Sequence, residues 1–200
     1  MSSSPALTII TRVPLPAYLD PQTVLDTLQT YEPLIMASPH AKKYERRQIQ
    51  VEELVDDPFF LENGHKIQAF VVHDRVPIIP GVGSWATKGV RVPCVFQSFE
   101  HGVRCRADSE AGVTVRSCYE VRRRGEIQGG SIVERRPGDG DYELVETASI
   151  DCGAFVKAFV KRTFTSAHQA TLQHVVDETV RKHGHVQQQE QQQQYRPQVA

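Results

Sequence analysis

The sequence has no apolar run that approaches the roughly 20 residues needed to cross a bilayer. Its first residues, MSSSPALTIITRV, also lack the basic start and long apolar stretch of a secretory signal. Lysine and arginine, 23 in total, nearly balance 24 aspartate and glutamate residues, so no general attraction to nucleic acid or to an anionic membrane is expected. We therefore predict a cytoplasmic protein that neither binds nucleic acid nor inserts into a membrane.

Recognisable signatures of metal, redox, phosphate and nucleophile chemistry are missing as well. The four cysteines, at positions 94, 105, 118 and 152, form no CxxC pattern, and we expect them to remain reduced. His168 and His174 lie six residues apart on a predicted helix, hence on different faces, and do not form a metal pair. The chain has no glycine-rich phosphate loop and no GxSxG turn. We expect a function that uses no metal and no cofactor.

What the sequence does contain is one long helical pattern, from Asp151 to His183. This stretch has no proline, and its only glycine is Gly153 at the start. Apolar or small residues recur along one face of a helix with 3.6 residues per turn. At about 1.5 Å per residue, the helix would be on the order of 45 Å long. Such a helix cannot bury its apolar stripe alone, so the rest of the chain must cover it.

The chain before this helix is typical of strands joined by turns. We predict strands at residues 6–13, 43–51, 66–76, 84–99, 103–107, 113–122 and 142–150, and short helical segments at 21–30 and 34–37. Strands segregated from helices predict an α+β fold with an antiparallel sheet. A twisted sheet of about six to seven strands curls. The long helix laid across its concave side would leave a cavity open to a ligand.

The domain boundaries follow from composition. We expect residues 1–5 to be a flexible start and residues 6–183 to form one domain. Residues 184–200 are rich in glutamine and have no apolar period, so they should be a disordered tail. One alternative function is therefore an interaction module that works through this tail.

Two segments carry a resemblance to a known family. The run HDRVPIIPG, residues 73–81, resembles the strand-to-bend motif of a fungal family of START-like proteins without an assigned function. The run DCGAFVKAFVKRTFTSAH, residues 151–168, is similar to the start of that family's long helix, at Cys152, Phe159, Val160, Lys161, Thr163, Ala167 and His168. The resemblance covers residues 6 to 182 and implies the helix-grip fold, in which a curved antiparallel sheet surrounds one long C-terminal helix, with two short helices after the first strand. The polar stretch 123–140 departs from the family and would lie near the cavity mouth.

The wider START-like (SRPBCC) superfamily resembled here includes lipid-transfer domains, pollen-allergen-like binders, plant hormone receptors and polyketide cyclases. The resemblance implies an apolar cavity between sheet and helix, but the fold alone does not choose among these functions. We predict a cofactor-independent cyclase or isomerase, of polyketide, terpenoid or pericyclic type, in fungal secondary-metabolite biosynthesis. A non-catalytic lipid or metabolite carrier or sensor remains the alternative. In both cases the partner is a hydrophobic small molecule.

His73 and Arg75 belong to the densest ionisable cluster on an apolar strand. Because neighbouring strand residues face opposite sides, these two share one face and Asp74 lies on the other. Facing a cavity, the pair would donate hydrogen bonds to a substrate carbonyl and stabilise charge on its oxygen. The alternative is structural: Arg75 pairs with an acidic neighbour and His73 caps the strand end.

Glu146 and Tyr119 are further candidates because each interrupts the apolar face of a strand. If that face is inward, Glu146 is a buried carboxylate able to act as a general acid or base. A shifted register would leave it solvated and inert. The Tyr119 hydroxyl would orient a ligand, or else be a satisfied core group. Residues expected to contact the ligand are Trp85, Phe70, Val115, Phe159 and Thr163.

Overall fold

The computed structural model describes residues 6–38, 40–50, 53, 57–60, 65, 67–77, 87–109, 112–129 and 133–184. Within these ranges, the side chains of residues 76, 77, 87, 155, 156, 158, 159, 161–163 and 184 are not described. The predicted flexible start at 1–5, and the predicted tail apart from residue 184, lie outside the described residues. The boundaries predicted for them stay predictions.

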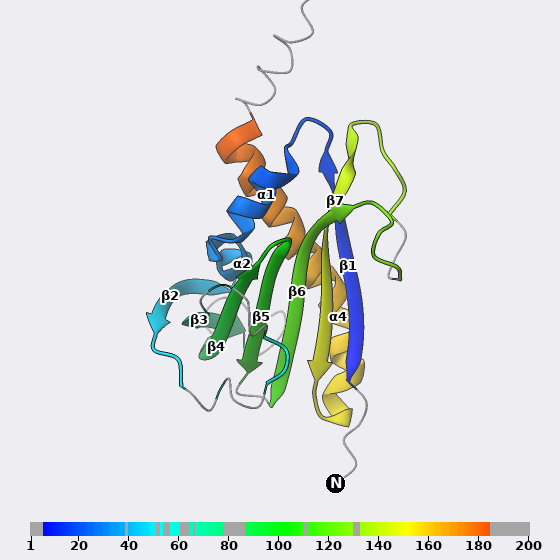
Figure 1. Ribbon diagram of the computed structural model, residues 1–200. Coiled ribbons are helices and arrows are strands. Elements are labelled where there is room, and N and C mark those ends of the chain that lie inside the picture. The colour runs from blue at the N-terminus through cyan, green and yellow to red at the C-terminus, as the bar shows by residue number, and fades with distance from the viewer. Residues whose placement is uncertain are drawn as a thin grey trace, which may run out of the picture.

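The described strands form one antiparallel sheet of seven, in the order β1-β7-β6-β5-β4-β3-β2 (Figure 1). Their bounds are β1 (Leu7–Pro16), β2 (Ala41–Arg47), β3 (Gln68–Pro77), β4 (Thr87–Phe99), β5 (Gly102–Ser109), β6 (Val113–Arg123) and β7 (Asp139–Asp151). Strands β2 to β7 pair in chain order, and β1 pairs with β7. The first and last strands of the chain are therefore neighbours.

One long helix, α4 (Ala154–Thr179), continues into the short π-helical turn η1 (Val180–Gly184) and crosses one face of the sheet (Figure 1). It packs against β1 and β7, and also against α1 (Pro21–Leu28) and α2 (Glu32–Met36), the two short helices that follow β1. Residues just before α1 fix its start, because the Asp20 carboxylate accepts a hydrogen bond from the Thr23 amide and Pro21 fits the first turn. The curved sheet, the long helix and the two short helices confirm the predicted helix-grip fold.

The first strand is longer than predicted. It continues through Pro14 to Pro16, with a register shift between these two residues. β1 lies at the edge of the sheet, where the missing proline N–H breaks no ladder hydrogen bond on the open side. The edge position thus explains why proline did not end the strand.

Alternating residues of the strands bury one face of the sheet against the helices. The larger apolar cluster lies under α1, α2 and the C-terminal half of α4, and includes Val13, Leu28, Phe96 and Leu172. A smaller cluster joins Ala148, Ile150 and Phe164 beneath the first half of α4. Between these two clusters the inner face carries the polar residues described below.

No helix among the described residues is both long and apolar enough to span a membrane. The predicted cytoplasmic location stays a prediction.

Candidate functional site

Glu146 is a carboxylic acid in the middle of the buried face of β7. It is 0% exposed, and it lies directly opposite Thr11 of β1 and Tyr119 of β6. The buried Leu144 and Ala148 lie on the same face, so the register faces Glu146 toward α4, the first of the two alternatives that the sequence left open. A carboxyl group removed from water in this way needs hydrogen-bond partners, and its partners define the site.

Side chains from β6 and α4 contact the Glu146 carboxyl group. Ser117 on β6 donates its hydroxyl to Oε1 over 2.6 Å. His168 on α4 places Nδ1 at 2.7 Å from both carboxyl oxygens. The imidazole also stacks on the ring of Phe164, one helical turn earlier, at 3.6 Å between centroids and 13° between planes. The carboxyl group and the stacked ring together fix the orientation of His168.

The hydrogen bond to Glu146 assigns roles to the two nitrogens of His168. The carboxylate form of Glu146 only accepts hydrogen bonds, and opposite this form Nδ1 carries the proton and donates it. In the neutral imidazole, the lone pair is then on Nε2. Among the described residues, none forms a hydrogen bond with Nε2. A carboxylate that orients a histidine is also the arrangement that activates a general base.

Tyr119 supplies a hydroxyl beside the same carboxyl group. Burial raises the pKa of Tyr119 well above its usual range, and the negative charge of Glu146 raises it further. The phenol therefore keeps its proton at ordinary pH and can donate a hydrogen bond. Gly102 of β5 lies directly against the backbone of Tyr119. A Cβ at position 102 would lie 1.8 Å from the Tyr119 carbonyl oxygen. Only glycine allows β5 to approach β6 this closely.

A cavity of about 260 Å³ lies between the sheet and α4, next to this cluster. Its walls come from α2, β3, β4, β5, β6 and α4, and most are apolar, as at Ile35, Val72 and Phe96. Tyr119 and His168 line it as well, together with Asp74 of β3. The cavity is slightly smaller than the roughly 300–1,000 Å³ typical of sites for drug-sized ligands. It therefore suits a small, mostly apolar molecule.

A second depression, of about 530 Å³, is larger but unrelated to the cluster. It lies near the start of α1 and the turn between β4 and β5, lined by charged residues that include Asp20, Glu100 and Arg123. Salt-bridged and solvated side chains of both signs line it, and it holds neither Glu146 nor His168. We therefore take the cavity beside Glu146 as the candidate site.

His73 and Arg75 are placed differently from the prediction that they face the cavity. Val72 and Asp74 line the cavity, so strand alternation puts His73 and Arg75 on the opposite face of β3. His73 Nε2 lies 3.6 Å from the exposed carboxylate of Glu45, and Arg75 is exposed. The structure therefore brings Glu146 and Tyr119 together but leaves His73 and Arg75 outside this cluster.

The residues predicted to contact a ligand are only partly described. Phe70 is buried in the large apolar cluster, packed edge-on against Phe96, and Val115 packs against the smaller cluster. Trp85 lies outside the described residues, as do the side chains of Phe159 and Thr163. Their contact with a ligand stays a prediction.

His168 is the functional candidate that sequence reasoning missed. In the sequence it is part of the family resemblance and a rejected metal ligand beside His174, but not a candidate for the site. The signal that would have found it is its spacing: Phe164, His168, Leu172 and Val175 follow one face of the helix. A histidine in that stripe faces the sheet, and Glu146 was a candidate for the same buried face. Among the described residues, no group of three or more His, Cys, Asp or Glu could hold a metal ion.

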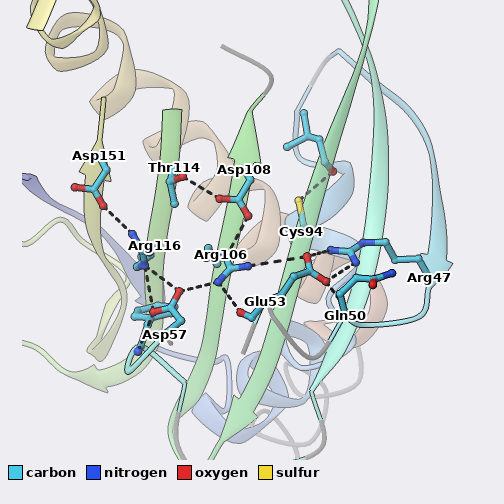
Figure 2. Close-up of polar contacts among 12 residues, drawn as sticks. Arg47, Gln50, Glu53, Asp57, Cys94, Arg106, Asp108, Thr114, Arg116 and Asp151 are labelled. Atoms are coloured by element: carbon cyan, nitrogen blue, oxygen red, sulfur yellow. Dashed lines mark hydrogen bonds and ion pairs between the residues drawn. The ribbon is translucent and has the colours of Figure 1, made fainter. Parts of the chain in front are cut away.

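The opposite face of the sheet carries a chain of ion pairs, which we call the outer network: Arg47, Glu53, Asp57, Arg106, Asp108, Arg116 and Asp151 (Figure 2). Asp57 bridges Arg106 at 2.8 Å and Arg116 at 3.2 Å, and Arg116 also reaches Asp151 at 2.7 Å. Burial alone would raise the pKa of Asp57, but the hydrogen bonds from Arg106 and the Phe59 amide and the charge of Arg116 outweigh it, so that this pKa is lowered. Asp57 lies between β2 and β3, so the network fastens that connection to the sheet.

Solved structures share this fold at low sequence identity. The protein TTHA0849 from Thermus thermophilus matches with a TM-score of 0.55 and 10% identity over 88% of this chain and 99% of that one. The di-domain ARO/CYC BexL from the BE-7585A biosynthetic pathway matches with a TM-score of 0.53 and 11% identity, over 86% of this chain and 49% of that one. The di-domain ARO/CYC StfQ from the steffimycin biosynthetic pathway matches with a TM-score of 0.51 and 9% identity, over 89% and 52%. This chain thus spans about half the length of the two di-domain proteins, and the similarity establishes the fold.

At the sequence level, the family model for the domain of unknown function DUF7053 matches residues 4–181. No curated protein matches the sequence significantly.

Proposed function

The chain belongs to the DUF7053 family, and we propose that it is a cofactor-independent cyclase or isomerase that acts on a small apolar carbonyl compound. The compound binds in the cavity between the sheet and α4, with Glu146, His168 and Tyr119 as the reacting groups. The fold shared with the ARO/CYC proteins BexL and StfQ supports this class of substrate. The resemblance to fungal START-like proteins supports a place in secondary-metabolite biosynthesis.

One observation carries the proposal: the contact of 2.7 Å between His168 Nδ1 and the fully buried Glu146. Burying a carboxyl group is unfavourable, and a histidine with only a structural role does not require one as its partner. The contact fixes the tautomer and leaves the Nε2 lone pair of a cavity-lining residue free. That arrangement is what proton abstraction from a bound molecule requires.

The chemistry proposed is an intramolecular aldol addition. His168 Nε2 removes a proton from a carbon next to a carbonyl, while the Tyr119 hydroxyl donates a hydrogen bond to the enolate oxygen that forms. The new carbanion attacks a second carbonyl of the same molecule, so that a carbon–carbon bond closes a ring. The resulting alkoxide takes the proton back from His168. Glu146 stabilises the positive charge on the imidazole throughout.

The apolar walls of the cavity lower the activation barrier further. They fold a flexible chain so that its two reacting carbons lie close together, which can remove a large part of the barrier. Ile35, Val72 and Phe96 provide such surfaces, and they also exclude water from the enolate.

The test is turnover of an unbranched diketone whose carbonyls are separated by three methylene groups. Cyclisation and loss of water give a cyclohexenone, which is followed by its ultraviolet absorbance. We expect the wild type to accelerate this reaction, and His168→Gln or Glu146→Gln to lower kcat by about 10²–10⁴-fold, the usual contribution of a general base. Tyr119→Phe should lower kcat by a smaller factor.

The control separates catalysis from binding. The same diketone should raise the Tm of the wild type and of His168→Gln alike, because the apolar walls are intact in both. As a matched substitution on the same helix, His174→Gln should leave kcat unchanged. If His168→Gln and His174→Gln lower kcat equally, the Glu146–His168 assignment is wrong.

The alternative is a carrier or sensor that binds the molecule without converting it. Its support is the predominance of apolar walls in a cavity of about 260 Å³. A rise in Tm with the diketone, combined with no turnover in the wild type, would favour this alternative over the cyclase.

A further inference from the structure

The cavity has a second polar wall, which the proposed reaction does not use. Asp74 of β3 lines the cavity, and its Oδ1 atom is buried with no hydrogen-bond partner among the described residues. Its sheet neighbours on the cavity side, Val72 and Val92, are apolar. A buried carboxyl oxygen without a donor, on a residue that lines a mostly apolar cavity, destabilises the empty protein.

Asp74 lies at the far end of the cavity from the Glu146–His168 pair. It is on β3, whereas Tyr119 is on β6, with β4 and β5 between them. At the usual strand spacing of about 4.8 Å, three strand steps correspond to on the order of 14 Å across the sheet. A molecule that fills the cavity therefore presents one end to Tyr119 and the other to Asp74.

The neighbours of Asp74 limit what can satisfy it from within the protein. Burial raises the pKa of Asp74, and the charge of the nearby His40 opposes this rise. Ser38 also lines this end, but its hydroxyl oxygen accepts a hydrogen bond from the His40 amide. His40 is exposed and keeps its hydration outside the cavity. Neither residue forms a hydrogen bond with Oδ1.

We propose that Asp74 recognises a hydroxyl group on the ligand, at the end opposite the reacting carbonyl, so that the substrates are hydroxylated ketones. The inference rests on the proposed function, since it assumes that a carbonyl compound occupies the cavity. A hydroxyl fits better than an ammonium group because the walls beside Asp74 are apolar and a charged donor would lose more hydration there. A hydroxyl also binds either protonation state of the carboxyl group.

The experiment measures the affinities of two matched probes by calorimetry. One is an unbranched methyl ketone, and the other is the same ketone with a hydroxyl on its terminal carbon. We expect the wild type to bind the hydroxyketone about tenfold more tightly, as a hydrogen bond to a carboxyl group allows. Asp74→Leu, of similar size but without an acceptor, should bind both ketones equally. Asp26→Leu, the same change on the exposed side of α1, should keep the tenfold ratio.

The Tm of the Asp74 variants distinguishes ligand recognition by Asp74 from a structural role. Asp74→Leu removes an unpaired buried oxygen, so its Tm without ligand should equal or exceed that of the wild type. A structural role predicts a clear fall in Tm. Asp74→Asn, which keeps an acceptor oxygen, should fold in any case and retain a preference of about two- to threefold for the hydroxyketone.

The outcomes separate the two proposals. If the wild type binds neither ketone, the proposed function fails, and this inference fails with it. If it binds both equally, or if Asp74→Leu keeps the preference, only the role of Asp74 is wrong. If an amine-terminated ketone binds more tightly than the hydroxyketone, the group recognised is an ammonium and the hydroxyl assignment is overturned.

Discussion

The two faces of the sheet use ionisable residues in opposite ways. On the outer face, each carboxylate of the network pairs with at least one arginine, as Asp57 does with Arg106 and Arg116 (Figure 2). On the inner face, Glu146 is bonded to a serine and a histidine, and Asp74 Oδ1, four strands away on β3, has no described partner. Each carboxylate of the outer network thus has an arginine partner, whereas one carboxyl oxygen of the inner face has none among the described residues.

The difference indicates what each face is selected for. The paired charges of the outer network hold the connection between β2 and β3 against the sheet. Polar groups without partners inside a cavity lower the stability of the empty protein. Such groups are retained where ligand binding compensates for the lost stability. The following predictions test this division, from the largest expected effect to the smallest.

Arg106→Leu should cause the largest loss of stability. Arg106 is about nine-tenths buried and bonds to Asp57, Asp108 and the Glu53 carbonyl. Its removal leaves buried carboxylates short of a partner, which costs about 3 kcal/mol in urea unfolding. The ligand-induced rise in Tm should remain, because Arg106 faces away from the cavity. If this variant loses ligand binding, the two faces of the sheet do not have separate roles.

Asp57→Asn should lose about 1–2 kcal/mol at neutral pH, since its hydrogen bonds to two arginines weaken. The lowered pKa of Asp57 gives the sign of the pH dependence. Its contribution is present above the unfolded aspartate value, roughly pH 4, and is lost as the pH falls through the lower folded value. The unfolding free energies of wild type and Asp57→Asn should therefore converge in acid. Curves that stay parallel down to about pH 2 would contradict this.

Tyr119→Phe should change stability by less than about 1 kcal/mol at neutral pH, because only one hydroxyl is lost. The raised pKa of Tyr119 predicts a larger effect in alkali. Above the unfolded tyrosine value, roughly pH 10, the wild type must lose stability as the pH rises, and the phenylalanine variant should lose less. Urea unfolding at pH values from neutral to alkaline measures the difference.

Arg135→Ala should have almost no effect, within about 0.5 kcal/mol. Its partner is Asp141 at 2.9 Å, and both side chains are more than 60% exposed. This variant serves as the baseline for Arg106→Leu. A comparable loss in both would mean that burial is not what distinguishes the outer network.

Periodicity was sufficient to predict the layout of the fold and part of the site. The alternation in β6 and β7 put Tyr119 and Glu146 each on the apolar face of its strand but left open whether the Glu146 face is inward, and the register of the structure decides this. The same rule was applied to β3 without knowing which face was inner, and there the structure puts Asp74 inside instead of His73 and Arg75. His168 was missed because its partner is 22 residues away and the contact depends on how the helix rotates over the sheet. The extent of β1 beyond Pro14 likewise depends on its edge position, which the sequence does not contain.

The pairing of β1 with β7 has a consequence for how the protein assembles. Arg12 and Glu143, which form a buried ion pair across these strands, are 131 positions apart. Joining such distant segments has a large entropic cost and slows folding. Glu146 lies on β7 between β1 and β6, so its surroundings are complete only after this last closure. During synthesis on a ribosome, the Glu146 carboxylate would be enclosed only after β7 and α4 have emerged, and shorter nascent chains would leave that face of the sheet open.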